Sequence, residues 1–130
     1  MVNDLSRAAF WQEFLLQQCY FPKPEALAEQ FENAEFLDFC ACGCNSFAVR
    51  IKPNANIVPL VPVGRYGLIF EADFHLVDEG KSLEILLFVD STGHLEYVEI
   101  DCCANSFPIP DEIQVDGPPY HLFVHKELGE

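Results

Sequence analysis

The sequence predicts an α+β domain in which two N-terminal helices pack on a mainly antiparallel sheet with a three-stranded meander. Two observations predict it: apolar residues recur every three or four positions up to about residue 34 and every second position afterwards, and turn residues separate three strand-like runs. A chain of 130 residues is the size of one domain with one core. We therefore expect a single domain over 1–130, with a helical part at 1–34, a sheet at 36–103 and an extended tail at 104–130.

The first predicted helix runs from Asp4 to about residue 20, and Asn3 or Asp4 can cap its start. Its apolar positions have helical spacing: Leu5, Ala8, Trp11, Phe14 or Leu15, and Cys19. Pro22 and Pro24 end it, because each proline removes a backbone donor and disfavours the helical conformation of the residue before it. Pro24 then suits the first turn of a short second helix that extends to Ala34.

The sheet is predicted from strand-like runs separated by turn residues. Residues 36–42 and 47–51 alternate and form two strands or one bent strand, and prolines make 53–64 an irregular or edge segment. The meander comprises runs at 66–77, 83–90 and 95–103, joined by Asp78-Glu79-Gly80-Lys81 and Ser91-Thr92-Gly93, both typical of hairpins. An apolar patch at 120–124 has the composition of a further edge strand.

The meander has two different faces, because alternate residues of a strand point to opposite sides. The face expected in the core comprises Phe70, Ala72, Phe74, Leu76, Leu83, Ile85, Leu87, Val89, Val98, Ile100 and Cys102. The other, which we call the mixed face, comprises Glu71, Asp73, His75, Glu84, Leu86, Phe88, Asp90, Leu95, Tyr97, Glu99 and Asp101. Two arrangements stay open: the helices cover the mixed face, or that face is free to bind another molecule.

The chain is strongly acidic, with 21 acids, 7 Lys or Arg residues and a formal charge of −14. Such a protein is not expected to bind nucleic acid or an anionic membrane, because both need a positive surface. The acidity is concentrated: nine acids and one lysine between Glu71 and Asp101 carry a formal charge of −8. Solubility needs only a modest net charge, so the excess favours a cationic partner.

The N-terminal segment carries an acid early and has no apolar signal region, and no apolar run approaches the ~20 residues of a membrane span. We therefore expect a cytoplasmic protein whose six cysteines are reduced thiols.

Three alternate cysteines, Cys40, Cys42 and Cys44, form the most unusual motif of the chain. Alternate cysteines on a strand share one face as packed small residues, and this is the interpretation we favour. The alternative is a zinc or copper(I) site, which requires Gly43 to turn the chain so that the three thiolates converge. We expect no reactive thiol, because the acidic background raises thiol pKa values.

No established catalytic signature is present, so we expect a protein that is not an enzyme and has no cofactor. His121 and His125 have metal-binding spacing for a helix but follow two prolines and are typical of a strand. Carboxylate pairs such as Glu71 with Asp73 and Glu99 with Asp101 could serve a hydrolase, but an acid-rich chain produces such pairs by chance.

Three segments carry a family resemblance: Phe39-Cys40-Ala41-Cys42-Gly43-Cys44-Asn45-Ser46, then Leu95-Glu96-Tyr97-Val98-Glu99-Ile100, then Phe107-Pro108-Ile109-Pro110. They resemble a family of small uncharacterised bacterial proteins with a Cys-x-Cys-Gly-Cys-x-Ser stretch. The short, acidic character is also similar to that of immunity proteins encoded beside bacterial toxins, including those of contact-dependent inhibition systems. Such a resemblance implies a protein that binds and blocks one toxin domain, often a basic nuclease.

Together these features predict an acidic binding protein that neutralises a cationic protein partner, most specifically a toxin nuclease domain. The alternative is a small zinc-binding domain using Cys40, Cys42 and Cys44. The residues expected to contact the partner are Glu71, Asp73, Glu84, Leu86, Phe88, Asp90, Tyr97, Glu99 and Asp101.

Overall fold

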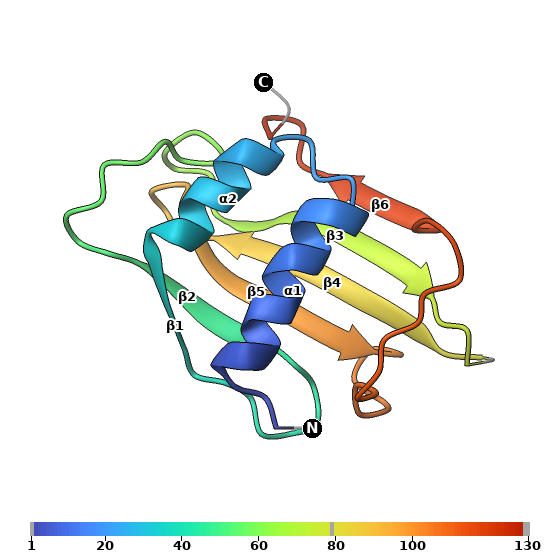
Figure 1. The fold of residues 1–130 in the computed structure, drawn as a ribbon. Coiled ribbons are helices and arrows are strands. Elements are labelled where there is room, and N and C mark those ends of the chain that lie inside the picture. The colour runs from blue at the N-terminus through green and yellow to red at the C-terminus, as the bar shows by residue number, and fades with distance from the viewer. Residues whose placement is uncertain (1, 79, 129–130) are drawn as a thin grey trace.

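A computed structural model describes residues 2–78 and 80–128, so Glu79 of the predicted turn lies outside the described residues. The fold is α+β: helices α1 (Leu5–Gln18) and α2 (Pro24–Glu32) precede a six-stranded antiparallel sheet, and both lie on one face of it (Figure 1). The strands are β1 (Ala34–Leu37), β2 (Phe47–Ile51), β3 (Gly67–His75), β4 (Ser82–Val89), β5 (Leu95–Cys102) and β6 (His121–Val124). Their order across the sheet is β1-β2-β5-β4-β3-β6.

Both helices begin as their sequences predict. The Asp4 side chain accepts a hydrogen bond from the Arg7 backbone N–H and caps α1, and Pro24 opens α2. The second helix ends two residues before Ala34, because Ala34 is already paired with Ile51 as the first residue of β1.

The core lies between the two helices and the apolar face of the meander. Trp11 and Phe14 of α1 are buried, and Phe14 meets Phe74 of β3 edge to face at 5.4 Å between ring centroids. Phe21, which follows α1, packs in the same way on Phe70 at 5.1 Å. The helices pack on the apolar face because large aromatic rings bury most of their area in such contacts.

The predicted meander is confirmed, since β3, β4 and β5 are antiparallel neighbours. The predicted edge strand is also present as β6, which pairs with β3. One assignment to a face was wrong: Leu95 is buried in the core, because a register shift beside Phe88 pairs Leu95 with Val89.

The predicted strand through Cys42 was also wrong. Strand β1 ends at Leu37, and residues 38–46 form a loop in which Gly43 has a φ of +106°, a conformation that favours glycine. The three alternate cysteines are therefore not packed side by side on a strand. No described helix is both long and apolar enough to cross a membrane.

Candidate functional site

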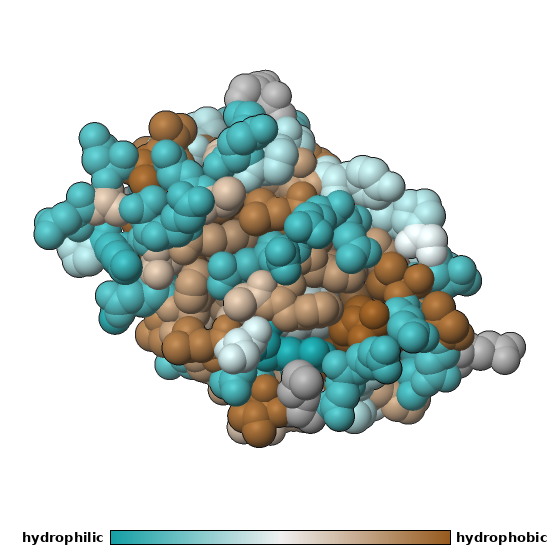
Figure 2. Space-filling view, in the orientation of Figure 1, coloured by the Kyte–Doolittle hydropathy of each residue, from teal (hydrophilic) through white to brown (hydrophobic). Residues whose placement is uncertain are grey.

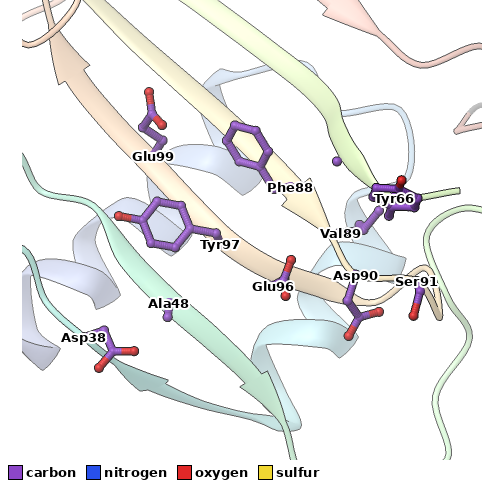
Figure 3. A pocket seen from close by; sticks show the side chains of 11 residues that line it. Asp38, Ala48, Tyr66, Phe88, Val89, Asp90, Ser91, Glu96, Tyr97 and Glu99 are labelled. Carbon is purple, nitrogen blue, oxygen red and sulfur yellow. The ribbon is translucent and has the colours of Figure 1, made fainter.

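The mixed face is the side of the sheet that the helices leave uncovered. Figure 3 looks at this side, with the helices behind the sheet and the Phe88 and Tyr97 rings in front of it. The opposite, helix-covered side of the molecule shows hydrophilic and hydrophobic residues intermingled (Figure 2). Of the two arrangements that the sequence left open, the structure has the one in which this face is not under the helices.

Strand pairing sorts the mixed face into rows that cross the sheet. One row is His121, Asp73, Glu84 and Asp101; the next is Phe123, Glu71, Leu86 and Glu99; the third is Leu68, Phe88, Tyr97, Ala48 and Leu37. The first row therefore holds three acids, the second row two and the third row none. A sequence alone does not show this sorting, because it depends on the register between strands.

A shallow hollow of about 830 Å³ lies at the apolar end of the mixed face. We call it the acidic hollow; its lining residues are Asp38, Ala48, Tyr66, Gly67, Phe88, Val89, Asp90, Ser91, Glu96, Tyr97 and Glu99. Four of these residues are acids and none is a lysine or arginine. The rings of Phe88 and Tyr97, 6.4 Å apart at an interplanar angle of 61°, lie between the acids (Figure 3).

Two pairs of carboxyl groups on the mixed face hold protons near neutral pH. Burial, followed by a hydrogen bond and repulsion from Asp73, raises the pKa of Glu71 to about 7. Burial, followed by the same two effects from Glu99, raises the pKa of Asp101 to about 7. Below this pH the Glu71 and Asp101 carboxyl groups hold a proton, so the mixed face carries less charge than its formal value.

Three of the nine predicted contact residues have structural partners of their own. Both oxygens of Glu84 accept hydrogen bonds, one from the Ser82 hydroxyl and one from the Ala104 backbone N–H. Asp90 accepts from Thr92 in the turn after β4. Asp73 is only 6% exposed and forms an ion pair with His121, so a partner can reach little of its side chain.

The remaining predicted contact residues are half-buried and accessible on the mixed face: Glu71, Leu86, Phe88, Tyr97, Glu99 and Asp101. Sequence reasoning missed Asp38, Tyr66 and Glu96 of the acidic hollow. Tyr66 directly precedes β3, whereas Asp38 follows β1 and reaches the hollow through the pairing of β1 with β2 and of β2 with β5.

The three cysteines converge in the loop after β1. Their sulfur atoms all lie within 4.8 Å of one another, and the Cys42 and Cys44 sulfurs are 3.2 Å apart. The three thiols converge because the chain turns at Gly43, as the metal-site alternative required. Among the described residues the cluster has no fourth ligand, and the six cysteines of the chain are unpaired thiols.

Two thiols of this cluster have opposite acidities. Hydrogen bonding with the Cys40 side chain, and then with Cys44, lowers the pKa of Cys42 to about 7, whereas burial raises the pKa of Cys44 to about 11. Cys42 is therefore the more acidic of the two thiols, and it is exposed. The expectation that acids raise the Cys42 pKa was wrong, because local hydrogen bonds outweigh the distant carboxylates.

The cysteine loop is anchored to the rest of the fold through Asn45. Its side-chain oxygen accepts from Arg7 Nε at 2.7 Å and from Trp11 Nε1 at 2.9 Å, both on α1. The Asn45 backbone N–H donates to the Ile100 carbonyl on β5, and the Gly43 carbonyl accepts from Ile109. The loop is therefore held from three directions.

Comparisons with protein-family models, curated proteins and solved structures found no match to this chain. The family resemblance described above therefore stays a prediction.

Proposed function

We propose that this protein is a non-enzymatic binding protein whose mixed face takes up a basic protein partner. The observation that carries the proposal is the acidic hollow, which three aromatic residues and four acids line together with no basic residue. Aromatic faces and carboxylates both attract guanidinium and ammonium groups. The hollow thus fits the arginine or lysine side chains of a basic protein surface.

The acids and the aromatic residues of the mixed face have different tasks in such a complex. The acids set up a negative field that speeds encounter with a basic partner, an effect that salt weakens. The half-buried Phe88 and Tyr97 provide apolar area that keeps the partner bound, since aromatic residues at the centre of an interface carry most of its energy.

The partner class that fits best is the nuclease domain of a bacterial toxin. A nuclease needs a cationic surface to hold phosphates. An acidic protein that occupies this surface excludes the nucleic acid without any chemistry of its own. In this role the protein acts in the cytoplasm, where it protects the nucleic acid of its own cell.

Variants of the mixed face test the proposal. Immobilised wild-type protein is used to isolate partners from the native cell, and the purified partner is then studied by stopped-flow binding. We expect a basic protein whose dissociation speeds up by about tenfold or more for the Phe88→Ala/Tyr97→Ala variant. We expect Glu96→Lys/Glu99→Lys to slow association and flatten its salt dependence.

The matched control is Glu13→Lys/Glu25→Lys, which makes the same change of charge at exposed positions of α1 and α2. It should leave association near the wild-type rate, apart from the small effect of net charge. A partner that is not basic, or one that both pairs of variants affect equally, would contradict the proposal.

A second candidate function is zinc binding, favoured by the convergence of Cys40, Cys42 and Cys44. Zinc–sulfur bonds of ~2.3 Å in a tetrahedral site place sulfurs ~3.8 Å apart. The sulfurs here lie within 4.8 Å, so small side-chain rotations are enough to bind a metal. Three thiolates leave the fourth position to an outside ligand.

Elemental analysis of protein purified without chelator tests this second candidate. We expect about one zinc per chain in the wild type and loss of the metal in Cys42→Ser. Cys103→Ser is the control, because Cys103 is a half-buried thiol outside the cluster. Metal-free protein in which all six thiols can be titrated would exclude a zinc site.

A further inference from the structure

A second group of possible metal ligands lies at the other end of the mixed face, on β3 and β6. Glu71 and Asp73 are two residues apart on β3, and His121 of β6 lies directly opposite Asp73. One ligand atom from each of these three residues lies within 4.8 Å of the others, and His121 Nδ1 is 2.8 Å from Asp73 Oδ2. The sequence does not show this proximity, because His121 follows Asp73 by 48 positions.

The second observation concerns the other oxygen of Asp73. Only 6% of the Asp73 surface is exposed. No N–H or hydroxyl donor among the described residues reaches the Oδ1 atom of this side chain. A buried carboxylate oxygen without a donor loses its hydration without compensation, which costs free energy. This oxygen therefore points to a missing positive partner.

We propose that Glu71, Asp73 and His121 form a binding site for a divalent first-row transition-metal cation. It is a site of different residues and different chemistry from the cysteine cluster, and it does not depend on the binding of a protein partner. Its ligands are two carboxylates and one imidazole, with the remaining coordination positions open to water.

The ligand set selects the class of metal. Carboxylates suit Mg²⁺, Ca²⁺ and Mn²⁺, while imidazole suits zinc and other transition metals, so the combination favours ions such as Mn²⁺ and Zn²⁺. Two ligand atoms about 2.1 Å from one metal at a right angle lie ~3 Å apart. The 2.8 Å between Nδ1 and Oδ2 agrees with this geometry.

The site is also accessible and adjustable. The His121 side chain is 53% exposed, so an ion can approach from solvent. When Nδ1 donates its lone pair to the metal, the ring proton resides on Nε2. A metal cation would also relieve the repulsion between Glu71 and Asp73, which a proton shared by these two groups otherwise reduces.

The chain contains its own control for this argument. Glu99 and Asp101 are also carboxyl groups two residues apart on one strand of the same face. They lack an imidazole, and neither is nine-tenths buried. A general attraction of Mn²⁺ to acids would appear equally at both pairs, whereas a specific site would appear only at the first.

Titration with Mn²⁺ at physiological salt, followed by the loss of the free-ion signal in electron paramagnetic resonance, tests the proposal. Mn²⁺ is the probe because thiolates are poor ligands for it, so the cysteine cluster does not contribute. We expect one ion per chain, with affinity reduced by about tenfold or more in His121→Gln. Because His121 is on the surface, circular dichroism should show an unchanged fold for this variant. Asp73→Asn alters the buried ligand, and we expect the same loss of Mn²⁺ affinity.

The control variants are Asp101→Asn and the Cys40→Ser/Cys42→Ser/Cys44→Ser triple variant, and both should bind Mn²⁺ as the wild type does. Absence of saturable binding would overturn the proposal. It would mean that a proton, and not a metal ion, reduces the repulsion between Glu71 and Asp73. Equal weakening by Asp101→Asn and His121→Gln would also overturn it, because Mn²⁺ would then respond only to the overall negative field.

Discussion

At the scale of single residues, Asn45 links the parts of the molecule that carry the candidate sites. It is 4% exposed, and its one side-chain oxygen satisfies two buried donors of α1, on Arg7 and Trp11. Arg7 also donates to the carbonyls of Pro110 and Asp111 in the tail. Buried donors must be satisfied, so Asn45 ties α1 and the tail to the cysteine loop.

Replacing Asn45 by alanine tests this role. We expect the free energy of unfolding, measured with urea, to fall by about 2–4 kcal/mol, because two buried donors lose their acceptor. Asn45→Asp keeps an acceptor oxygen near both donors and should cost less. A change below ~0.5 kcal/mol for the alanine variant would show that these hydrogen bonds are dispensable.

At the scale of elements, β5 joins the core to the mixed face. Val98, Ile100 and Cys102 are buried under the helices, while Tyr97, Glu99 and Asp101 alternate with them on the uncovered side. The strand therefore cannot move a carboxyl group away from its neighbour without moving core residues. This constraint keeps the carboxyl pair close together.

The stability of the fold should depend on pH through Asp101. Its folded pKa of about 7 lies above the ordinary aspartate value of 3.8, so the folded state holds a proton that the unfolded chain releases. Stability should therefore fall as pH rises from ~4 to ~7. Because solvent screens this half-buried group, the effect is on the order of 1 kcal/mol. Glu99 beside it and Glu84 opposite it on β4 are the facing acids.

Urea unfolding between pH 5 and pH 8 measures this dependence. Asp101→Asn should be less sensitive to pH than the wild type, because the asparagine does not titrate. Glu71 contributes in the same direction in both proteins, so part of the dependence remains. An Asp101→Asn variant with the full wild-type dependence would contradict the assignment.

At the scale of the whole molecule, the single-sided placement of the helices decides what the charge can do. Placing a helix over the mixed face would remove several carboxyl groups from water, at a cost of several kcal/mol for each ion that stays charged. Covering the apolar face instead buries the rings of Phe70 and Phe74. The fold thus leaves half-buried carboxyl groups such as Glu71, Glu99 and Asp101 accessible on the uncovered side of the sheet.

The sequence by itself determined the elements and the two faces of the meander. Helical spacing before residue 34, alternation after it and the two hairpin turns are local signals, so the helices, the three meander strands and the Tyr120–Val124 patch could be predicted. The same local signals misassigned Cys42 to a strand and Leu95 to the mixed face, because loops and register shifts depend on distant partners.

Only the tertiary structure decided which face the helices cover and which distant side chains meet. Asp73 and His121 come together because β6 pairs with β3, and Asp38 joins Phe88 and Tyr97 at one hollow because β1 pairs with β2 and β2 with β5. Alternation along one strand determines which way a side chain points. The neighbour across the sheet is determined by strand order and register, which result from the packing of the whole core.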